Sequence, residues 1–180
     1  MTTLRICLHG PESTGKSTLC TRLAAHLGCE VVPEYGRAYC EAHGTDIGMA
    51  ELVHIAQQQD VMNRMAAGRA AELDIRQVLF DTDPLITAVW AEMMFGKRDP
   101  WFDSFSRYAD LYLLLDIDLP FVDDGLRVYA SPDQRHRFFE LCKGELDRRG
   151  VRYAIIRGQG DARFDAALRA VSTAEVGDSP

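Results

Sequence analysis

A glycine-rich stretch near the amino end carries the clearest chemical signal in the chain. Residues 10–17 read Gly-Pro-Glu-Ser-Thr-Gly-Lys-Ser and match G-x-x-x-x-G-K-[ST] at every fixed position. In this pattern backbone N–H groups point inward at phosphates, the lysine reaches the β- and γ-phosphates, and the final hydroxyl binds Mg²⁺. An apolar run before it and a helical pattern after it disfavour a chance match in a glycine turn. The stretch therefore predicts a site for ATP and Mg²⁺. The residues expected to hold the nucleotide are Gly10, Pro11, Glu12, Ser13, Thr14, Gly15, Lys16, Ser17 and Thr18.

Two carboxylates follow a second apolar run. Gln77–Phe80 has the pattern of a buried strand, and Asp81 and Asp83 come directly after it. In an extended chain these two side chains project to the same side, which brings both near the metal and the reacting phosphate. We expect Asp81 to bind Mg²⁺ together with Ser17, and Asp83 to contact the phosphoryl acceptor or to take its proton. The alternative for Asp83 is that it caps the helix beginning at Pro84.

A third acidic residue follows the short strand expected over Glu30–Pro33. Because ligands gather beyond the carboxyl ends of parallel strands, Glu34 should face the same crevice as the phosphate loop. Glu34 is therefore a second candidate for the base, or a ligand for sugar hydroxyls; the alternative is a glutamate that pairs with a helix dipole. Arg37 could bind phosphate or pair with Glu34, and Tyr35 could stack on a ring or simply pack. The sequence does not choose between Glu34 and Asp83 as the base.

A polar arm is expected at about residues 120–136, between an apolar strand and a helix. Phosphoryl transfer needs a cation that neutralises charge on the moving group, and the segment that supplies it must close over the site. Arg127 and Arg135 are placed for this role, with Arg127 as the catalytic cation. The alternative for Arg135 is a solvated salt bridge on the helix.

An apolar helix expected over Pro84–Phe95 contains a tryptophan. Trp90 could form a wall for an aromatic base. The alternative is that it belongs to the core, as a tryptophan within a helix more often does.

These residues need a scaffold in which strands alternate with helices. The pattern predicts one α/β domain of three layers over residues 1–172, a P-loop NTPase fold with a five-stranded parallel sheet and helices on both faces. By analogy with nucleotide kinases, the strand order is 2-3-1-4-5. Residues 173–180 are expected to form a disordered tail. The strands are expected at Leu4–His9, Glu30–Pro33, Gln77–Phe80, Asp110–Asp116 and Val151–Ile156, and the helices at Ser17–Leu27, Met49–Leu73, Pro84–Phe95, Pro132–Arg149 and Ala162–Val171.

Composition limits the partners. The 180 residues carry a formal net charge of −7 with scattered basic residues, which argues against binding nucleic acid and in favour of small anions held locally. The five cysteines form no C-x-x-C pair, so reduced thiols in the cytoplasm are expected. No apolar run approaches ~20 residues and no leader pattern opens the chain, so neither a membrane span nor secretion is expected. The sequence leaves the oligomeric state open.

Taken together, four motifs resemble the ribosylnicotinamide kinase domain of NadR-type proteins of NAD salvage. They are the phosphate loop, Glu-Tyr-Gly-Arg at 34–37, Asp-Thr-Asp at 81–83 and Val-Asp-Asp-Gly-Leu-Arg at 122–127. The likeness covers roughly Leu4 to Ile156. It implies transfer of the ATP γ-phosphoryl group to the 5′-hydroxyl of nicotinamide riboside, giving nicotinamide mononucleotide and ADP. The carboxylates of Asp123, Asp124, Glu34 and Asp83 would suit the cationic ring of that substrate.

The chain departs from the family in two respects. It lacks the H-x-G-H signature of the adenylyltransferase domain that NadR-type proteins typically carry, so the resemblance implies phosphorylation without adenylation. Phe121 stands where the family commonly has tryptophan. The alternatives are a P-loop kinase for another nucleoside or small metabolite, and a regulatory ATPase.

Overall fold

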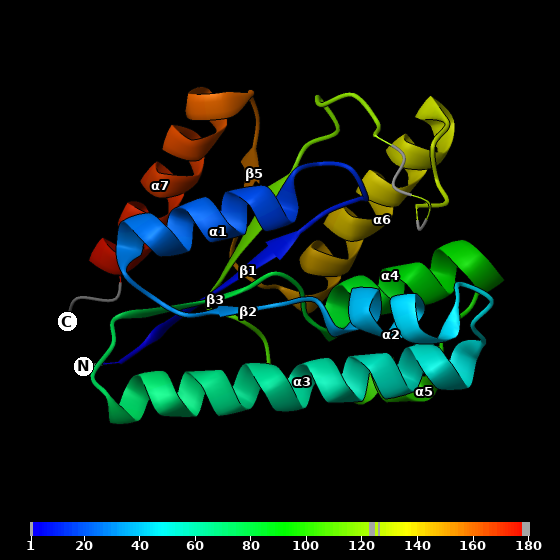
Figure 1. Cartoon of the computed structure of the whole chain (residues 1–180), viewed down its shortest axis with the longest axis horizontal. Helices are drawn as coiled ribbons and strands as arrows, with labels where there is room; N and C mark the ends of the chain where they lie inside the picture. Colours follow the sequence, from blue (N-terminus) through cyan, green and yellow to red (C-terminus); the bar gives the residue numbers. More distant parts are fainter. Residues whose placement is uncertain (1, 123–124, 126, 178–180) are drawn as a thin grey trace.

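The structure of the chain is a computed structural model and describes residues 2–122, 125 and 127–177. Strands and helices alternate through these residues (Figure 1). In chain order the elements are β1 (Leu4–His9), α1 (Lys16–Leu27), β2 (Val31–Val32), α2 (Tyr35–His43), α3 (Met49–Glu72), β3 (Gln77–Phe80), α4 (Pro84–Phe95), α5 (Pro100–Ser104), β4 (Leu111–Leu115), α6 (Pro132–Arg149), β5 (Tyr153–Ile156) and α7 (Gly160–Gly177).

The five strands form one parallel sheet in the order β2-β3-β1-β4-β5. This confirms the predicted fold class and strand order. In the register of the sheet, Cys7 of β1 lies opposite Phe80 of β3 and Tyr112 of β4. The carboxyl ends of the three central strands therefore meet at one edge, which is where ligands bind in open α/β sheets.

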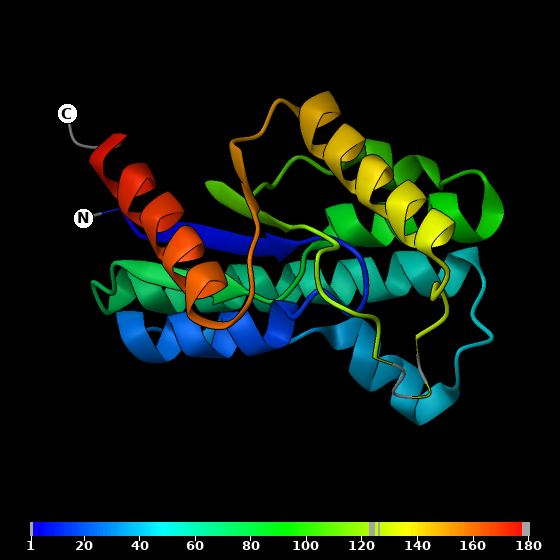
Figure 2. The ribbon, with the colours of Figure 1, turned by 90° about the horizontal axis from the view of Figure 1, so that it is seen from above.

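Alternating residues of the central strands enter two separate cores. Leu4, Ile6 and Leu8 of β1 pack with residues of α1 and α7. Cys7 faces the other side and packs with residues of α3, α4 and α6. Figure 1 shows α1 and α7 above the sheet and α3 below it, so the three layers are those that the sequence predicted. Seen from above in Figure 2, the arm and α2 lie at the end of the molecule where the strands finish.

The carboxyl-terminal helix is longer than the sequence predicted. The prediction of a disordered tail from residue 173 is wrong for residues 173–177, which belong to α7. The physical reason is that Val171 and Ala174 are fully buried against the sheet, and that Thr173 O accepts a hydrogen bond from Arg152 at 3.1 Å. Gln77 of β3 also donates to the carboxylate of Glu175. Residues 178–180 lie outside the described range.

Two helices have no counterpart among the predicted elements. The first, α2, follows Glu34 directly, and the second, α5, contains five residues. The helix α5 is too short to show a hydrophobic period, but Asp99 caps it by accepting from Trp101 N at 2.8 Å. No helix within the described residues has the length and hydropathy needed to cross a membrane.

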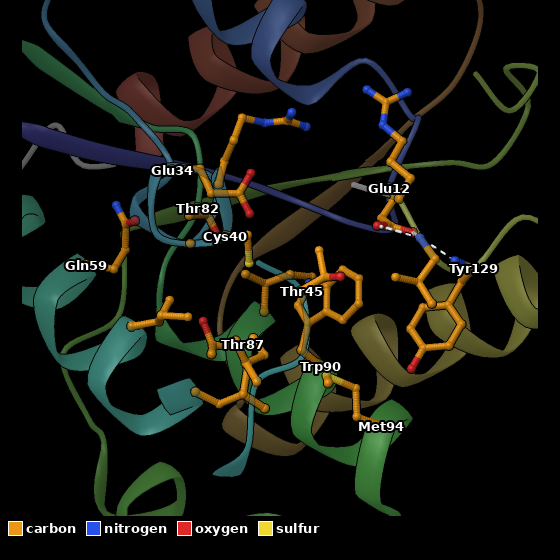
Figure 3. A pocket seen from close by; sticks show the side chains of 18 of the residues that line it. Glu12, Glu34, Cys40, Thr45, Gln59, Thr82, Thr87, Trp90, Met94 and Tyr129 are labelled. Carbon is orange, nitrogen blue, oxygen red and sulfur yellow. Dashed lines mark hydrogen bonds between the residues drawn. The ribbon is translucent and has the colours of Figure 1, made fainter. Parts of the chain in front are cut away.

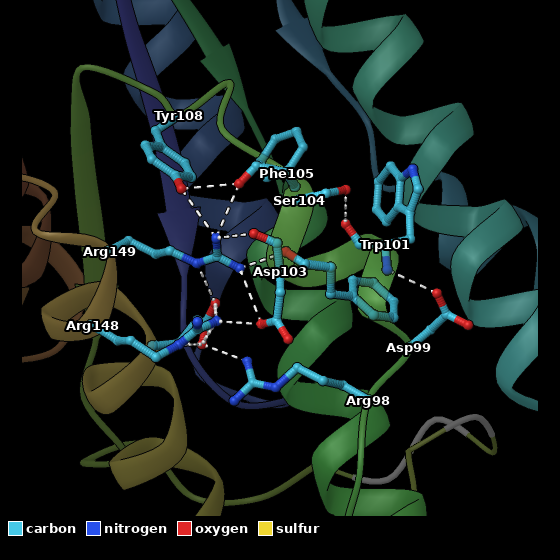
Figure 4. Close-up of polar contacts among 11 residues, drawn as sticks. Arg98, Asp99, Trp101, Asp103, Ser104, Phe105, Tyr108, Arg148 and Arg149 are labelled. Carbon is cyan, nitrogen blue, oxygen red and sulfur yellow. Dashed lines mark hydrogen bonds and ion pairs between the residues drawn. The ribbon is translucent and has the colours of Figure 1, made fainter.

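A buried carboxylate of α6 binds three arginines, one of which lies in the segment before α5. The side chain of Glu145 is 3% exposed and accepts hydrogen bonds from Arg98, Arg148 and Arg149, at 2.8 Å in the shortest case for each (Figure 4). Burial alone would raise the pKa of Glu145, but the arginine hydrogen bonds outweigh it and lower the pKa. Arg149 also donates to Phe105 O at 3.0 Å. This network fixes the segment that leads into β4.

Candidate active site

The phosphate loop curls between β1 and α1 in a conformation that requires glycine. Gly10 has φ 127°, and a Cβ atom there would lie 2.8 Å from the carbonyl oxygen of Leu115 in β4. Gly15 has φ 80°, and Ser13 adopts a left-handed conformation at φ 57°. Because L side chains rarely adopt these angles, the glycines of the motif are needed for the loop's shape.

The interior of the loop is held by its own hydrogen bonds. Lys16 Nζ donates to Gly10 O at 2.9 Å and to Pro11 O at 2.7 Å, and Thr14 Oγ1 donates to Pro11 O at 2.9 Å. Arg163 of α7 donates to Thr14 O at 3.2 Å. Lys16 also opens α1, so the first backbone N–H groups of this helix lie at the same place. The loop thus has the shape of a phosphate site, with Thr18 exposed in the first turn of α1.

Ser17 and Asp81 are brought together as predicted. Ser17 Oγ donates to Asp81 Oδ2 at 2.6 Å. The other carboxylate oxygen, Oδ1, is buried and has no hydrogen-bond partner among the described residues. A hydroxyl oxygen beside a carboxylate is a donor set that Mg²⁺ prefers, and a buried oxygen that lacks a partner is satisfied when a cation or its water binds. The two residues therefore fit the metal that the phosphate loop implies.

A pocket of about 490 Å³ opens beside the phosphate loop. Its wall contains Glu12 and Ser13 of the loop, and the arm contributes Arg127 (Figure 3). The opposite side is formed by α3 and α4, where the lining is largely apolar. Residues from these two helices are Leu52, Ile55, Gln59, Ile86, Thr87, Trp90, Met94 and Phe95. A small molecule held here would lie next to the terminal phosphate of a nucleotide on the loop.

Glu34 lies in the wall of this pocket, at the start of α2. Glu34 occupies the N-cap position of α2, where a carboxylate also interacts favourably with the helix dipole, although within the described residues its side chain makes no capping hydrogen bond. Burial raises the pKa of Glu34, Lys16 opposes the shift, and the charge of Asp81 adds to it. A carboxylate with a raised pKa in a pocket wall has the properties of a general base.

Two buried amides, those of Gln59 and Asn63, fix the backbone around Glu34, and neither is marked as functional by a motif in the sequence. Gln59 accepts from Tyr35 N at 2.7 Å and donates to Pro33 O at 3.1 Å. Gln59 also donates to Asn63 Oδ1 at 3.0 Å, and Asn63 donates to Thr82 O at 3.0 Å. The signal that could have revealed this pair is the spacing of two amides four residues apart on a helix face that is otherwise buried.

Asp83 does not belong to the lining of this pocket, and its contacts favour the capping alternative. Its Oδ1 accepts from Leu85 N at 3.0 Å and its Oδ2 accepts from Tyr112 Oη at 2.5 Å, so it is the cap of α4. The side chain is 3% exposed and faces a second pocket of about 260 Å³, which Asp60 and Arg107 also line. Burial raises the pKa of Asp83 to about 6, although both hydrogen bonds oppose the shift. The capping alternative is therefore the better description of Asp83.

Two aromatic rings form one end of the pocket. Trp90 of α4 and Tyr129 of the arm face each other with ring centroids 5.4 Å apart and an interplanar angle of 35° (Figure 3). Phe138 of α6 packs edge-on against Trp90 at 5.0 Å. Both interpretations of Trp90 are therefore correct in part: its side chain packs against the core, and it also lines the pocket. Tyr129 was not predicted, because the arm shows no period that marks an inward position.

The remaining predicted residues divide between the pocket and its surroundings. Arg37 lines the pocket, whereas Tyr35 lies outside the lining and packs beside Tyr39, with ring centroids 6.3 Å apart. Arg127 donates to Ser13 Oγ at 3.1 Å, so this cation lies over the phosphate loop. Arg135 is buried on α6 and donates to Leu119 O at 2.9 Å. The predicted substrate residues Asp123 and Asp124 lie outside the described residues.

Comparisons with known proteins identify the family and the fold of this chain. The model of a family described as an AAA domain matches residues 5–163. The trifunctional NAD biosynthesis/regulator protein NadR of Escherichia coli (strain K12) is 30% identical over 168 residues, covering 88% of this chain and 40% of that protein. The corresponding NadR of Salmonella typhimurium (strain LT2) is 29% identical over the same length. The chain therefore spans less than half the length of these two relatives.

Solved structures show the same likeness. A crystal structure of NadR protein in complex with NR superimposes with a TM-score of 0.83 at 27% identity, covering 96% of this chain and 51% of that chain. Thymidylate kinase from Ehrlichia chaffeensis superimposes with a TM-score of 0.68 at 12% identity and covers 96% of this chain and 99% of that one. At that identity the second likeness concerns the fold alone.

Proposed function

Because this chain belongs to the AAA domain family and is similar to NadR proteins, we propose that it is an ATP-dependent kinase for nicotinamide riboside. The reaction transfers the γ-phosphoryl group of ATP to the 5′-hydroxyl and gives nicotinamide mononucleotide and ADP. The observation that carries the proposal is the pocket of about 490 Å³ whose wall holds both the phosphate loop and Glu34.

The nucleotide side of the reaction rests on the phosphate loop. Lys16 exchanges the carbonyl oxygens of Gly10 and Pro11 for phosphate oxygens when ATP binds, which places its charge on the β- and γ-phosphates. Ser17 and Asp81 hold Mg²⁺, directly or through water. When bound, the metal neutralises charge on the transferring group. Arg127 lies over the loop and stabilises the charge that develops as the phosphoryl group moves.

Glu34 acts as the general base. It lines the pocket whose wall also contains Glu12 and Ser13 of the phosphate loop, so an acceptor held in the pocket would lie between Glu34 and the nucleotide. Glu34 takes the proton of the 5′-hydroxyl as the oxygen attacks the γ-phosphorus and the bond to the bridging β–γ oxygen breaks. Asp83 is excluded from this role in the proposal, because both of its oxygens are engaged at the start of α4.

The acceptor side suits a flat cationic ring. Trp90 and Tyr129 offer aromatic faces, and a cation is attracted to the face of such a ring. The carboxylates of Glu12, Glu34 and Asp46 line the same pocket, against the guanidinium groups of Arg37 and Arg127. With centroids 5.4 Å apart, Trp90 and Tyr129 must separate if a ring is to enter between them; a ring that stacks on one outer face needs no such movement.

A substrate panel tests the proposal. Purified protein with ATP and Mg²⁺ is mixed in turn with nicotinamide riboside, uridine, cytidine and thymidine, and mass spectrometry identifies the phosphorylated product. We expect ADP to appear with nicotinamide riboside and not without an acceptor. Lys16→Ala should abolish the activity, whereas the matched control Lys143→Ala, a half-exposed lysine of α6 that pairs with Asp147, should retain it.

Other outcomes separate the alternatives. Product with a different nucleoside alone would show a kinase of another specificity. Steady hydrolysis of ATP with no acceptor would show a regulatory ATPase. Either result would contradict the proposed function.

A further inference from the structure

Glu12 belongs to the phosphate loop but binds the arm. Its carboxylate accepts from the backbone N–H of Val128 at 3.1 Å and from that of Tyr129 at 3.0 Å, as the dashed lines in Figure 3 show. The third position of the motif is a variable one, so the motif itself assigns no function to this side chain. The carboxylate thus joins the nucleotide loop to a segment more than a hundred residues away in the chain.

The next residue of the loop binds the other end of the same segment. Ser13 Oγ accepts from Val122 N at 2.7 Å and from Arg127 at 3.1 Å. The loop therefore holds the arm both at Val122 and at residues 127–129. The two bonds to the Glu12 carboxylate and the bond from the Arg127 guanidinium to Ser13 are charge-assisted, because one partner in each is ionised.

Glu12 is held in a partly buried, positively charged setting. Burial raises the pKa of Glu12, while the N–H groups of Tyr129 and Val128 and the charges of Lys16 and Arg127 oppose the shift. The carboxylate is thus stabilised by the arm that it holds. Removing it would leave two N–H groups of the arm without their acceptor.

The attachment reaches the acceptor pocket through Tyr129. Glu12 fixes the backbone N–H of Tyr129, whose ring faces Trp90 at 5.4 Å, and all three residues line the pocket. We infer that Glu12 is a positioning residue for the acceptor: it holds Tyr129 where its ring completes the aromatic end of the pocket. Glu12 would therefore govern acceptor affinity although it lies in the nucleotide loop. The identity of the acceptor rests on the function proposed above, whereas the attachment does not.

Steady-state kinetics provide the first test. Glu12→Ala is compared with Glu12→Gln, which keeps one acceptor oxygen, and with Glu140→Gln, a matched change at an exposed site on α6. For Glu12→Ala we expect the KM for nicotinamide riboside to rise about tenfold or more, and by a clearly larger factor than the KM for ATP. Glu12→Gln should restore part of the affinity. Equal increases in both KM values, or none, would overturn the inference.

Tryptophan fluorescence provides a second test that needs no catalysis. The chain contains two tryptophans, so a Trp101→Phe background isolates the emission of Trp90. Glu12→Ala should make Trp90 more accessible to the quencher acrylamide, to the extent that Tyr129→Ala does, with an unchanged circular dichroism spectrum. Unchanged quenching would overturn the inference. If the wild-type protein phosphorylates no nucleoside, the proposed function fails, while this measurement still decides whether Glu12 holds the arm.

Discussion

The side-chain amide of Gln59 hydrogen-bonds to the peptide groups on both sides of Glu34. Its oxygen accepts from the peptide N–H that follows the glutamate, and its nitrogen donates to the carbonyl that precedes it, at 2.7 Å and 3.1 Å. Both peptide groups next to the proposed base are thus held by one buried side chain. The position of the base is set by α3 rather than by the short strand β2 that precedes it.

Replacing Gln59 should therefore reduce turnover as well as stability. Gln59→Ala removes both bonds and leaves buried polar groups without partners, which costs about 1–3 kcal/mol of unfolding free energy. We expect kcat to fall about tenfold, because the base is no longer held in place. Urea denaturation and initial rates measure the two effects. Gln57→Ala, a change at an exposed neighbour, is the control. An equal effect there would argue against the role of the two Gln59 hydrogen bonds in positioning Glu34.

Glu34→Gln should lower kcat by a factor of about 10²–10⁴, the usual contribution of a general base, with little change in either KM. The raised pKa of Glu34 predicts that the wild-type rate falls as the pH decreases through that pKa, because the carboxylate becomes protonated. This dependence should be absent from the residual activity of the variant. Asp83→Asn tests whether Glu34 rather than Asp83 is the general base. A loss of turnover as large as that of Glu34→Gln would indicate that Asp83 takes part in the reaction.

Removal of Mg²⁺ by EDTA should abolish phosphoryl transfer, and added Mg²⁺ should restore it. Asp81→Asn should raise the Mg²⁺ concentration needed for half-maximal rate at least tenfold, because Asp81 Oδ1 is a buried oxygen without a partner among the described residues, which the metal or its water would satisfy. Asp165→Asn on the exposed face of α7 is the matched control. An unchanged Mg²⁺ requirement in Asp81→Asn would contradict the proposed ligand.

Asp83 should make the protein less stable as the pH rises. Its pKa is about 6 in the fold against an ordinary value of 3.8, so between these values the folded state binds the proton more tightly than the unfolded state. The stabilisation is present below the ordinary value and is lost as the pH rises through about 6, by at most about 3 kcal/mol. Urea denaturation from about pH 4 to pH 7 should show this loss in wild type and not in Asp83→Asn. Parallel curves for the two proteins would contradict it.

The sequence was sufficient to predict the sheet and the phosphate loop, because both depend on local patterns. The apolar strands, the glycines at fixed positions and the pair formed by Ser17 and Asp81 all appear as expected. Asp83 could not be distinguished from Asp81 by alternation alone. What separates them is Tyr112, which binds Asp83 from a strand 29 residues later in the chain.

The parts that escaped prediction depend on contacts between distant segments. Glu12 meets Tyr129 across 117 residues, and no local period marks either partner. The carboxyl-terminal end of α7 does not depend on such a distant contact for its recognition. Val171 and Ala174 continue the helical spacing of buried residues. That spacing was present in the sequence, and the small and polar residues around it led to the wrong prediction of a tail.

The close approach of Gly10 to β4 determines which sequences the loop can tolerate. A Cβ atom there would meet a main-chain carbonyl that is itself fixed within the sheet, so no rotamer change can relieve the clash. At Gly28, which also has a positive φ, a Cβ atom would meet nothing within 4 Å, so only the backbone preference opposes a substitution. In a library randomised at both codons and selected for activity, position 10 should return glycine alone, whereas position 28 should also admit asparagine.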